Sequence, residues 1–301
     1  MKKFTKSSFG DLLLDAFIYG FLVLLAIICI YPLYQVIVVS ISDPAIVMKN
    51  NGMMLIPKGI HFDAYKIVLS NHNLLTGFKN TLFYIVVGTS LVLFTTATGA
   101  YVLSKKNVML KKPIMIYLTI TMYFGGGLIP GYLLINNLHL MNTPWAILLP
   151  GAFSVWDIII MRTQFANIPD ALKEAAVIDG ASDFTILTRI LLPLSGAVIA
   201  VLVLFSAVGH WNEWFSPMLY LTERSKYPIQ SVLREILIDN SSQMMAGAGK
   251  IQTRFDAKNN AAAKTLVKYA NIVVCTIPIL VVYPFLQKYF VNGVIVGSLK
   301  G

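Results

Sequence analysis

The sequence predicts an all-α integral membrane protein with six transmembrane helices, and two features carry this prediction. Of the 301 residues, 56% are hydrophobic and only 13% are charged, whereas a soluble domain keeps roughly a quarter of its residues charged. The apolar residues also gather in long stretches that short polar loops separate. Much of the chain must therefore face lipid, where a helix can satisfy all of its own backbone hydrogen bonds.

A transmembrane helix needs about 20 mainly apolar residues, because the hydrocarbon core is roughly 30 Å thick and a helix rises about 1.5 Å per residue. Six stretches meet or nearly meet this length: 16–41, 79–104, 113–135, 144–162, 190–215 and 269–290. The first is too long for the apolar region of a signal peptide, and no small-residue cleavage site follows it. We therefore expect residues 1–301 to form one transmembrane domain with a retained first span.

The basic residues predict how these spans are oriented. Lys and Arg outnumber Asp and Glu by 24 to 14, but they lie largely between apolar stretches, which favours a role in membrane orientation over nucleic-acid binding. Lysines precede the first span and crowd the 105–112 turn, whereas the 136–143 turn has no Lys or Arg. Because cytoplasmic loops are enriched in Lys and Arg, we expect both termini, the 105–112 turn and the 163–189 segment to be cytoplasmic.

The segment 216–268 then lies on the extracytoplasmic side, although it contains eight Lys and Arg residues. At about fifty residues it approaches the length at which such counts lose their force. Apolar residues recur at helical spacing in 231–238, and 261–270 also favours a helix. Both a docking surface for a partner and a cover over a transport pathway fit this segment.

The third predicted span contains Gly125-Gly126-Gly127 and then Pro130-Gly131. Glycine adds backbone freedom, and proline removes a hydrogen-bond donor, so the helix is expected to kink or unwind near its outer end. Close helix packing, which glycine favours in membranes, and a flexible gate are both compatible with this run.

Residues 169–189 predict two short helices joined by a glycine turn. Pro169 suits the first helical position, and Asp170 favours the positive end of the helix. Gly180 can end that helix in the left-handed conformation, and Ser182 can cap the next. One side of the first helix carries mostly small residues, which would let a partner approach closely. From the residues alone, a docking element and an amphipathic connector on the bilayer surface remain open.

The same segment contains a spaced pattern, which reads Glu174-Ala175-Ala176, three residues, Gly180, nine residues, Ile190, one residue, Leu192-Pro193. This pattern resembles the EAA signature of binding-protein-dependent ABC importer permeases, and both spacings match without a gap. The stretches 125–130, 209–215 and 289–301 look like those of carbohydrate-uptake permeases. Within these, the chain is most similar to the MalG/LplC-like group of oligosaccharide importers.

The resemblance implies a non-catalytic permease subunit of an ATP-driven carbohydrate importer in a bacterial cytoplasmic membrane. It implies four kinds of partner: a second homologous permease, two ATPase subunits, an extracytoplasmic sugar-binding protein or lipoprotein, and the sugar, expected to be an oligosaccharide. The chain has no G-x-x-x-x-G-K-[ST] phosphate loop, so ATP and Mg²⁺ are expected on the ATPase subunits. No cofactor or metal is expected on this chain.

The resemblance also assigns roles within the signature. Residues 174–180 would sit in a cleft of an ATPase subunit, and Gly180 would set the angle at which the helix ends. Ile190, Leu192 and Pro193 would join the motion to the fifth span.

Polar residues inside spans are costly and mark candidate substrate contacts. Asp157 lies in the fourth span, and Trp211, Asn212, Glu213 and Trp214 lie at the outer end of the fifth. Aromatic faces beside planar hydrogen-bonding groups suit sugar binding. Trp at a bilayer boundary is also a common interfacial anchor, and Asp157 could equally pair with a cation on a neighbouring helix or subunit.

The alternative function is an ion-gradient-driven secondary transporter. Such a protein needs buried carboxylates or broken helices at the bilayer midplane, often in internally repeated halves. The sequence shows no convincing repeat and no carboxylate cluster, and no Ser/His/Asp, metal-ligand or paired-carboxylate pattern points to an enzyme.

Overall fold

The computed structural model describes residues 9–50, 54–238, 265–281 and 284, and every regular element among them is a helix. The chain divides into two compact units. One comprises residues 1–71 and 241–276, and the other comprises residues 72–240 and 277–301. The C-terminal tail, residues 239–264 of the expected outer segment and most of the expected last span beyond residue 281 lie outside the described residues.

The first unit contains α1 (Phe9–Ser40), α2 (Pro44–Lys49) and α3 (Asp63–Leu69), together with the helix Thr265–Val281 up to residue 276. None of the apolar window of α1 is buried within the chain. The Asp43 side chain caps α2 by accepting a hydrogen bond from the Ala45 backbone N at 2.8 Å. A long apolar surface left open within its own unit is typical of a helix that contacts lipid or other apolar helices.

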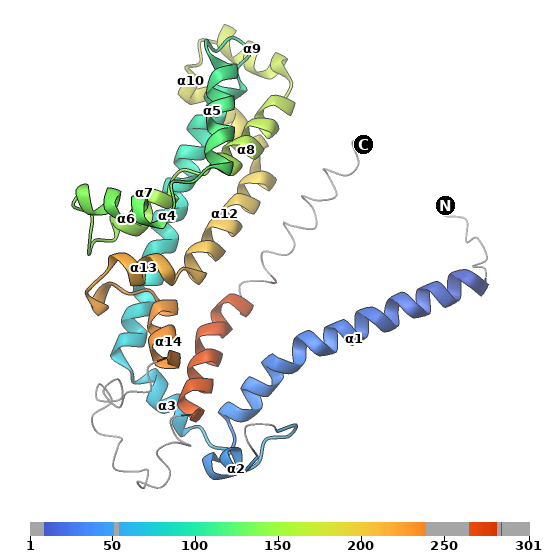
Figure 1. The fold of residues 1–301 in the computed structure, drawn as a ribbon. Coiled ribbons are helices and arrows are strands. Elements are labelled where there is room, and N and C mark those ends of the chain that lie inside the picture. The colour runs from blue at the N-terminus through green and yellow to red at the C-terminus, as the bar shows by residue number, and fades with distance from the viewer. Residues whose placement is uncertain (1–8, 51–53, 239–264, 282–283, 285–301) are drawn as a thin grey trace. The chain divides into compact units, whose positions relative to one another are not determined.

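The second unit is organised around α4 (His72–Ser104), against which α8 (Val155–Asn167), α12 (Gly196–Asn212) and α14 (Ile229–Ile238) pack (Figure 1). Glycines in α4 allow two of these helices to come close. A Cβ added at Gly77 would lie 3.2 Å from the Ile229 Cα, and one at Gly88 would collide with the His210 imidazole. Gly77 therefore lets the backbone of α14 approach α4 closely, and Gly88 makes room for the His210 side chain of α12.

Three of the expected spans are pairs of helices that meet at a bend. The first pair, α5 (Lys111–Tyr123) and α6 (Leu128–Asn137), is bent by 112°. The second, α7 (Trp145–Gly151) and α8, is bent by 45°, and the third, Asp183–Leu194 with α12, is bent by 85°. By length and composition, two helices of the described chain could cross a membrane, or up to five if each bent pair is one span. The count of six spans stays a prediction.

The break between α5 and α6 confirms the expectation for the glycine run. Gly127 has a φ of +88°, a conformation that glycine adopts at no steric cost. A Cβ added at Gly125 or Gly127 would meet nothing within 4 Å. Among the described residues of this unit, Gly125 and Gly127 therefore serve the change of direction and have no close packing partner.

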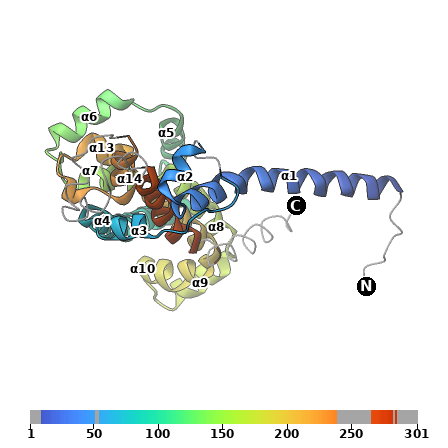
Figure 2. The ribbon, with the colours of Figure 1, turned by 90° about the horizontal axis from the view of Figure 1, so that it is seen from below.

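The elements that carry the candidate sites lie toward the two ends of α4. Figure 1 shows α9 (Asp170–Ile178) and α10 (Asp183–Ile186) at one end, and α13 (Phe215–Tyr220) and α14 toward the other. In the perpendicular view, α6 and the α9–α10 pair project on opposite sides of α4 (Figure 2). After α10 the chain continues as a π-helix, Leu187–Leu191, and then as α11 (Leu192–Leu194). The expected fifth span 190–215 is thus interrupted at Ser195 and begins its straight part only at Gly196.

Candidate functional site

The first candidate site is the segment 169–191, which we name the α9–α10 module. Gly180 follows α9 with a φ of +77°. The Gly180 backbone N donates to the Val177 carbonyl at 3.0 Å, and the Ala181 N donates to the Ala176 carbonyl at 2.9 Å. This pair of bonds is a Schellman cap, in which the left-handed residue is usually glycine. The predicted helix, glycine turn and helix are confirmed, with Pro169 placed as the residue that precedes the first helical position.

The second helix of the module begins at the cap expected from the sequence. The Ser182 side chain accepts a hydrogen bond from the Thr185 backbone N at 3.3 Å. Such a bond satisfies one of the free N–H groups of the first turn. Both ends of the glycine turn are therefore held by local hydrogen bonds.

The module is anchored in the second unit by apolar residues on either side of α9. Ile168 precedes α9, and Ile186, Leu187 and Leu191 follow it; all four are buried in one cluster with residues of α4, α8 and α12. By contrast, α9 itself has no buried residue. Large apolar side chains on or next to it are exposed, with Ile178 at 85%, Phe184 at 72% and Val177 at 60%. An exposed helix on a packed base is a surface available to a partner.

Two ion pairs tie the module to the turn after α4, and we name them the basic clasp. Lys105 Nζ lies 2.7 Å from Asp183 Oδ2, and Lys106 Nζ lies 2.7 Å from Asp170 Oδ2. The Tyr101 hydroxyl also donates to Asp183 Oδ1 at 2.7 Å. The clasp therefore joins the start of α9 and the start of α10 to the same short turn.

The charges of the clasp are mutually stabilised. The hydrogen bond from Lys106, followed by that from Lys173, lowers the pKa of the Asp170 carboxyl. Hydrogen bonding to Asp183 is the largest cause that raises the pKa of Lys105. In each of the two ion pairs the pKa of the Asp carboxyl is lowered and the pKa of the Lys ammonium is raised, so both members stay charged at neutral pH.

The signature residues differ in exposure. Glu174, Ala175, Gly180 and Pro193 are exposed, whereas Ala176, Ile190 and Leu192 are half-buried. Ala176 and Leu192 pack against the same apolar cluster that anchors the module. The signature residues therefore fall into an exposed set, Glu174, Ala175, Gly180 and Pro193, and a set that faces the core, which includes Ala176 and Leu192.

The candidate substrate residues do not form one cluster. Trp211 is 8% exposed, and its ring lies 6.2 Å from that of Phe78. Asn212 donates to the Val208 carbonyl at 3.0 Å, and Glu213 accepts from the Ser216 backbone N at 3.0 Å. These three residues make local or core contacts.

Asp157 lies apart from this stretch, in the first turn of α8, where its backbone N donates to Ser154 Oγ at 3.2 Å. Among the described residues, no hydrogen bond or ion pair joins Asp157 to residues 211–214. The sequence placed these residues in one candidate site because they are polar and lie in or beside spans; their packing distributes them over different surroundings.

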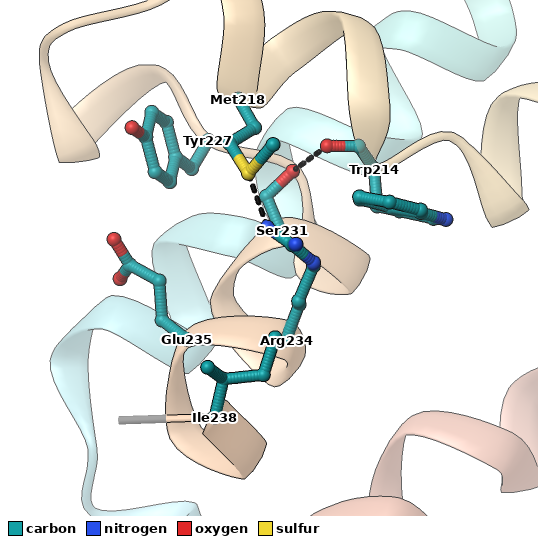
Figure 3. A pocket seen from close by; sticks show the side chains of 7 residues that line it. All are labelled: Trp214, Met218, Tyr227, Ser231, Arg234, Glu235 and Ile238. Carbon is teal, nitrogen blue, oxygen red and sulfur yellow. Dashed lines mark hydrogen bonds between the residues drawn. The ribbon is translucent and has the colours of Figure 1, made fainter. Parts of the chain in front are cut away.

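Trp214 is the exception, because it lines a pocket of about 220 Å³, which we name the outer pocket (Figure 3). Its lining residues come from α13, α14 and the chain beside them: Trp214, Met218, Tyr227, Ser231, Arg234, Glu235 and Ile238. The Arg234 guanidinium lies over the Trp214 ring, 4.3 Å from its centroid. The Ser231 hydroxyl donates to the Trp214 carbonyl at 3.3 Å.

Sequence reasoning missed the other members of this pocket, although a signal was present. The helix expected at 231–238 is confirmed as part of α14, and Ile229 and Val232 of its apolar face are buried. Ser231, Arg234, Glu235 and Ile238 follow at helical spacing on another face. One face of α14 packs against α4, and the residues of this second face line the outer pocket.

A bundle of apolar, partly broken helices with an exposed, rigidly capped helix pair at one end describes a transport subunit that works with other proteins. Residues 98–296 match the family described as the binding-protein-dependent transport system inner membrane component. The chain belongs to this family, so the expectation raised by the pattern at 174–193 is confirmed.

Relatives resemble the chain over nearly its whole length. The chain is 38% identical to the polygalacturonan/rhamnogalacturonan transport system permease protein YtcP of Bacillus subtilis (strain 168). The aligned 289 residues cover 96% of this chain and 99% of that protein. The chain is 40% identical over 275 residues to protein LplC of the same organism, covering 91% of this chain and 90% of the other.

A solved structure has the same fold. It is the crystal structure of a bacterial ABC transporter involved in the import of the acidic polysaccharide alginate. One of its chains matches with a TM-score of 0.87 and 33% sequence identity, covering 95% of this chain and 99% of that one.

Proposed function

We propose that the chain is a membrane-spanning subunit of an ATP-driven importer for a carbohydrate, and that the carbohydrate is an oligosaccharide. The α9–α10 module carries this proposal, because it presents the signature residues on an exposed helix whose two flanks are buried in the core. The names of the similar proteins, which concern polygalacturonan, rhamnogalacturonan and alginate, support a saccharide as the cargo.

In this proposal, α9 is the part that an ATPase subunit holds. Residues 174–180 would lie in a cleft of that subunit, with the exposed Glu174 and Ala175 at the contact. Movement of α9 would reach the spans through Ile186, Leu187 and Leu191, because a close-packed core transmits displacement instead of absorbing it. The ATPase would then shift the population between inward-open and outward-open states by its preference for one of them.

The remaining partners follow from the same assembly. A second permease subunit would complete the pathway, two ATPase subunits would bind ATP and Mg²⁺, and an extracytoplasmic binding protein would deliver the sugar. The α9–α10 module, the basic clasp and both termini would face the cytoplasm of a bacterium, and the outer pocket would face the other side. This chain would supply no catalytic residue.

The experiment measures uptake of a radiolabelled oligosaccharide by right-side-out membrane vesicles that contain the complete set of subunits. Accumulation should require ATP inside the vesicles and should persist after ionophores have collapsed the ion gradients. A vesicle preparation without this chain is the control. Accumulation that needs an ion gradient and ignores ATP would instead establish the secondary-transporter alternative.

A further inference from the structure

The outer pocket contains a cation that no carboxylate of the described residues neutralises. Arg234 and Glu235 are its charged lining residues. Glu235 pairs with Arg224, whose Nε lies 3.5 Å from Glu235 Oε1. Arg234 contacts the Trp214 ring and the Met218 sulfur. The positive charge of Arg234 is therefore available to a ligand.

Arg234 keeps N–H donors for a planar acceptor, because a guanidinium carries five of them and only Nη1 donates to another side chain, the Met218 sulfur, among the described residues. The guanidinium lies over the Trp214 ring, 4.3 Å from its centroid, and its planar fork of N–H donors matches the geometry of a carboxylate. The Met218 thioether is only a weak acceptor. A guanidinium placed over an aromatic ring in this way can still bind a carboxylate through two parallel hydrogen bonds.

The rest of the pocket suits a sugar ring that carries such a carboxylate. Figure 3 shows Trp214 and Tyr227 on opposite sides, with Ser231 and Arg234 between them. Aromatic surface matches the apolar face of a sugar. The hydroxyl groups of Ser231 and Tyr227 donate to the Trp214 and Leu221 carbonyls, and their oxygens can still accept hydrogen bonds from sugar hydroxyls. At about 220 Å³ the pocket is smaller than the roughly 300–1,000 Å³ of ordinary ligand clefts, so it fits one unit of a longer chain.

We propose that the outer pocket is a subsite for one uronate unit of an acidic oligosaccharide, whose carboxylate Arg234 binds. The proposal rests on the proposed function and narrows its substrate class. A solved relative is named for import of an acidic polysaccharide, which agrees with this charge. A carboxylate side chain of the binding protein could instead occupy the pocket, and one outcome of the test identifies that case.

The test measures uptake in vesicles with the complete importer and saturating, sugar-loaded binding protein. The probes are trigalacturonate and the same trisaccharide after its carboxyl groups have been reduced to alcohols. Arg234→Gln should lower the rate for trigalacturonate about tenfold or more, because a charge-assisted bidentate contact is lost. The rate for the reduced trisaccharide should stay unchanged. Arg234→Lys, which keeps the charge without the fork, should give an intermediate rate.

The matched control is Lys79→Gln, since Lys79 is an exposed cation of α4 that does not line the pocket. It should leave both rates unchanged, and rates are normalised to the amount of chain in the membrane. Equal losses for the two sugars, or no loss for trigalacturonate, would overturn the proposal.

Three further outcomes separate the possible failures. If Arg234→Gln instead raises the concentration of binding protein needed for half-maximal ATP hydrolysis with either sugar, Arg234 contacts the binding protein and the subsite is refuted. If the wild type imports only the reduced trisaccharide, the subsite is refuted while the proposed function stands. If the wild type imports neither trisaccharide nor any other labelled oligosaccharide with ATP, the proposed function itself fails.

Discussion

At the scale of single residues, Gly180 is the position where backbone conformation and proposed role coincide. Its φ of +77° lets the cap bonds of Gly180 and Ala181 form, and a Cβ added there would meet nothing within 4 Å. Space is therefore not the constraint. The left-handed backbone conformation is what restricts this position, because it costs an ordinary L residue roughly 1–2 kcal/mol.

We expect Gly180→Val to lower ATP hydrolysis that depends on the sugar-loaded binding protein by about fivefold to thirtyfold, which corresponds to that strain. Gly180→Asn should have a much smaller effect, since Asn tolerates the left-handed region. ATPase assays on the reconstituted complex, with membrane insertion checked by immunoblot, measure both. Equal activity of the Val variant and the wild type would contradict a role of this turn in coupling.

At the scale of elements, the basic clasp joins two short helices to the turn after α4. Its ion pairs are largely exposed, with side-chain exposures of 40% for Lys105 and 68% for Asp183, so each is weak and sensitive to salt. The lowered pKa of Asp170 means that its pairing with Lys106 is present above the ordinary carboxyl pKa and is lost only as the pH falls through the lowered value. Salt concentration, and not pH near neutrality, is the variable that weakens the clasp.

Reversal of one charge should loosen the module. Lys105→Glu places two carboxylates where the pair stood and should reduce coupled ATP hydrolysis by no more than about fivefold, as expected for an exposed pair. Adding Asp183→Lys to this variant should restore part of the activity, because opposite charges face each other again. The two single variants, the double variant and the wild type form a double-mutant cycle. A cycle without coupling would show that the pair is irrelevant to function.

At the scale of the whole molecule, the proposed orientation places the basic clasp and the outer pocket on opposite sides of the membrane. The positive-inside pattern of the short loops supports this orientation, and the basic residues of 216–268 oppose it. Labelling of single cysteines with a membrane-impermeant reagent decides between the two orientations.

In a variant without Cys29 and Cys275, a cysteine at Ser225 should react with a membrane-impermeant maleimide in intact cells. A cysteine at Asn107 should react only after the membrane is permeabilised. Both positions are exposed polar sites in short connections between longer helices, so they are matched in exposure. The reverse pattern would invert the proposed orientation and remove the α9–α10 module from the cytoplasm.

The sequence by itself determined the membrane class, the helix–glycine–helix segment at 169–189 and the family, because each depends on residue types at short spacing. It also indicated the break at 125–127, where glycine and proline act locally. Only the tertiary structure decided the partners of Lys105 and Arg234 and the composition of the outer pocket. Lys105 and Asp183 are 78 positions apart, and the pocket forms only when the apolar face of α14 packs against α4. Contacts of this range depend on which helices meet, and that is a property of the packed chain rather than of any local pattern.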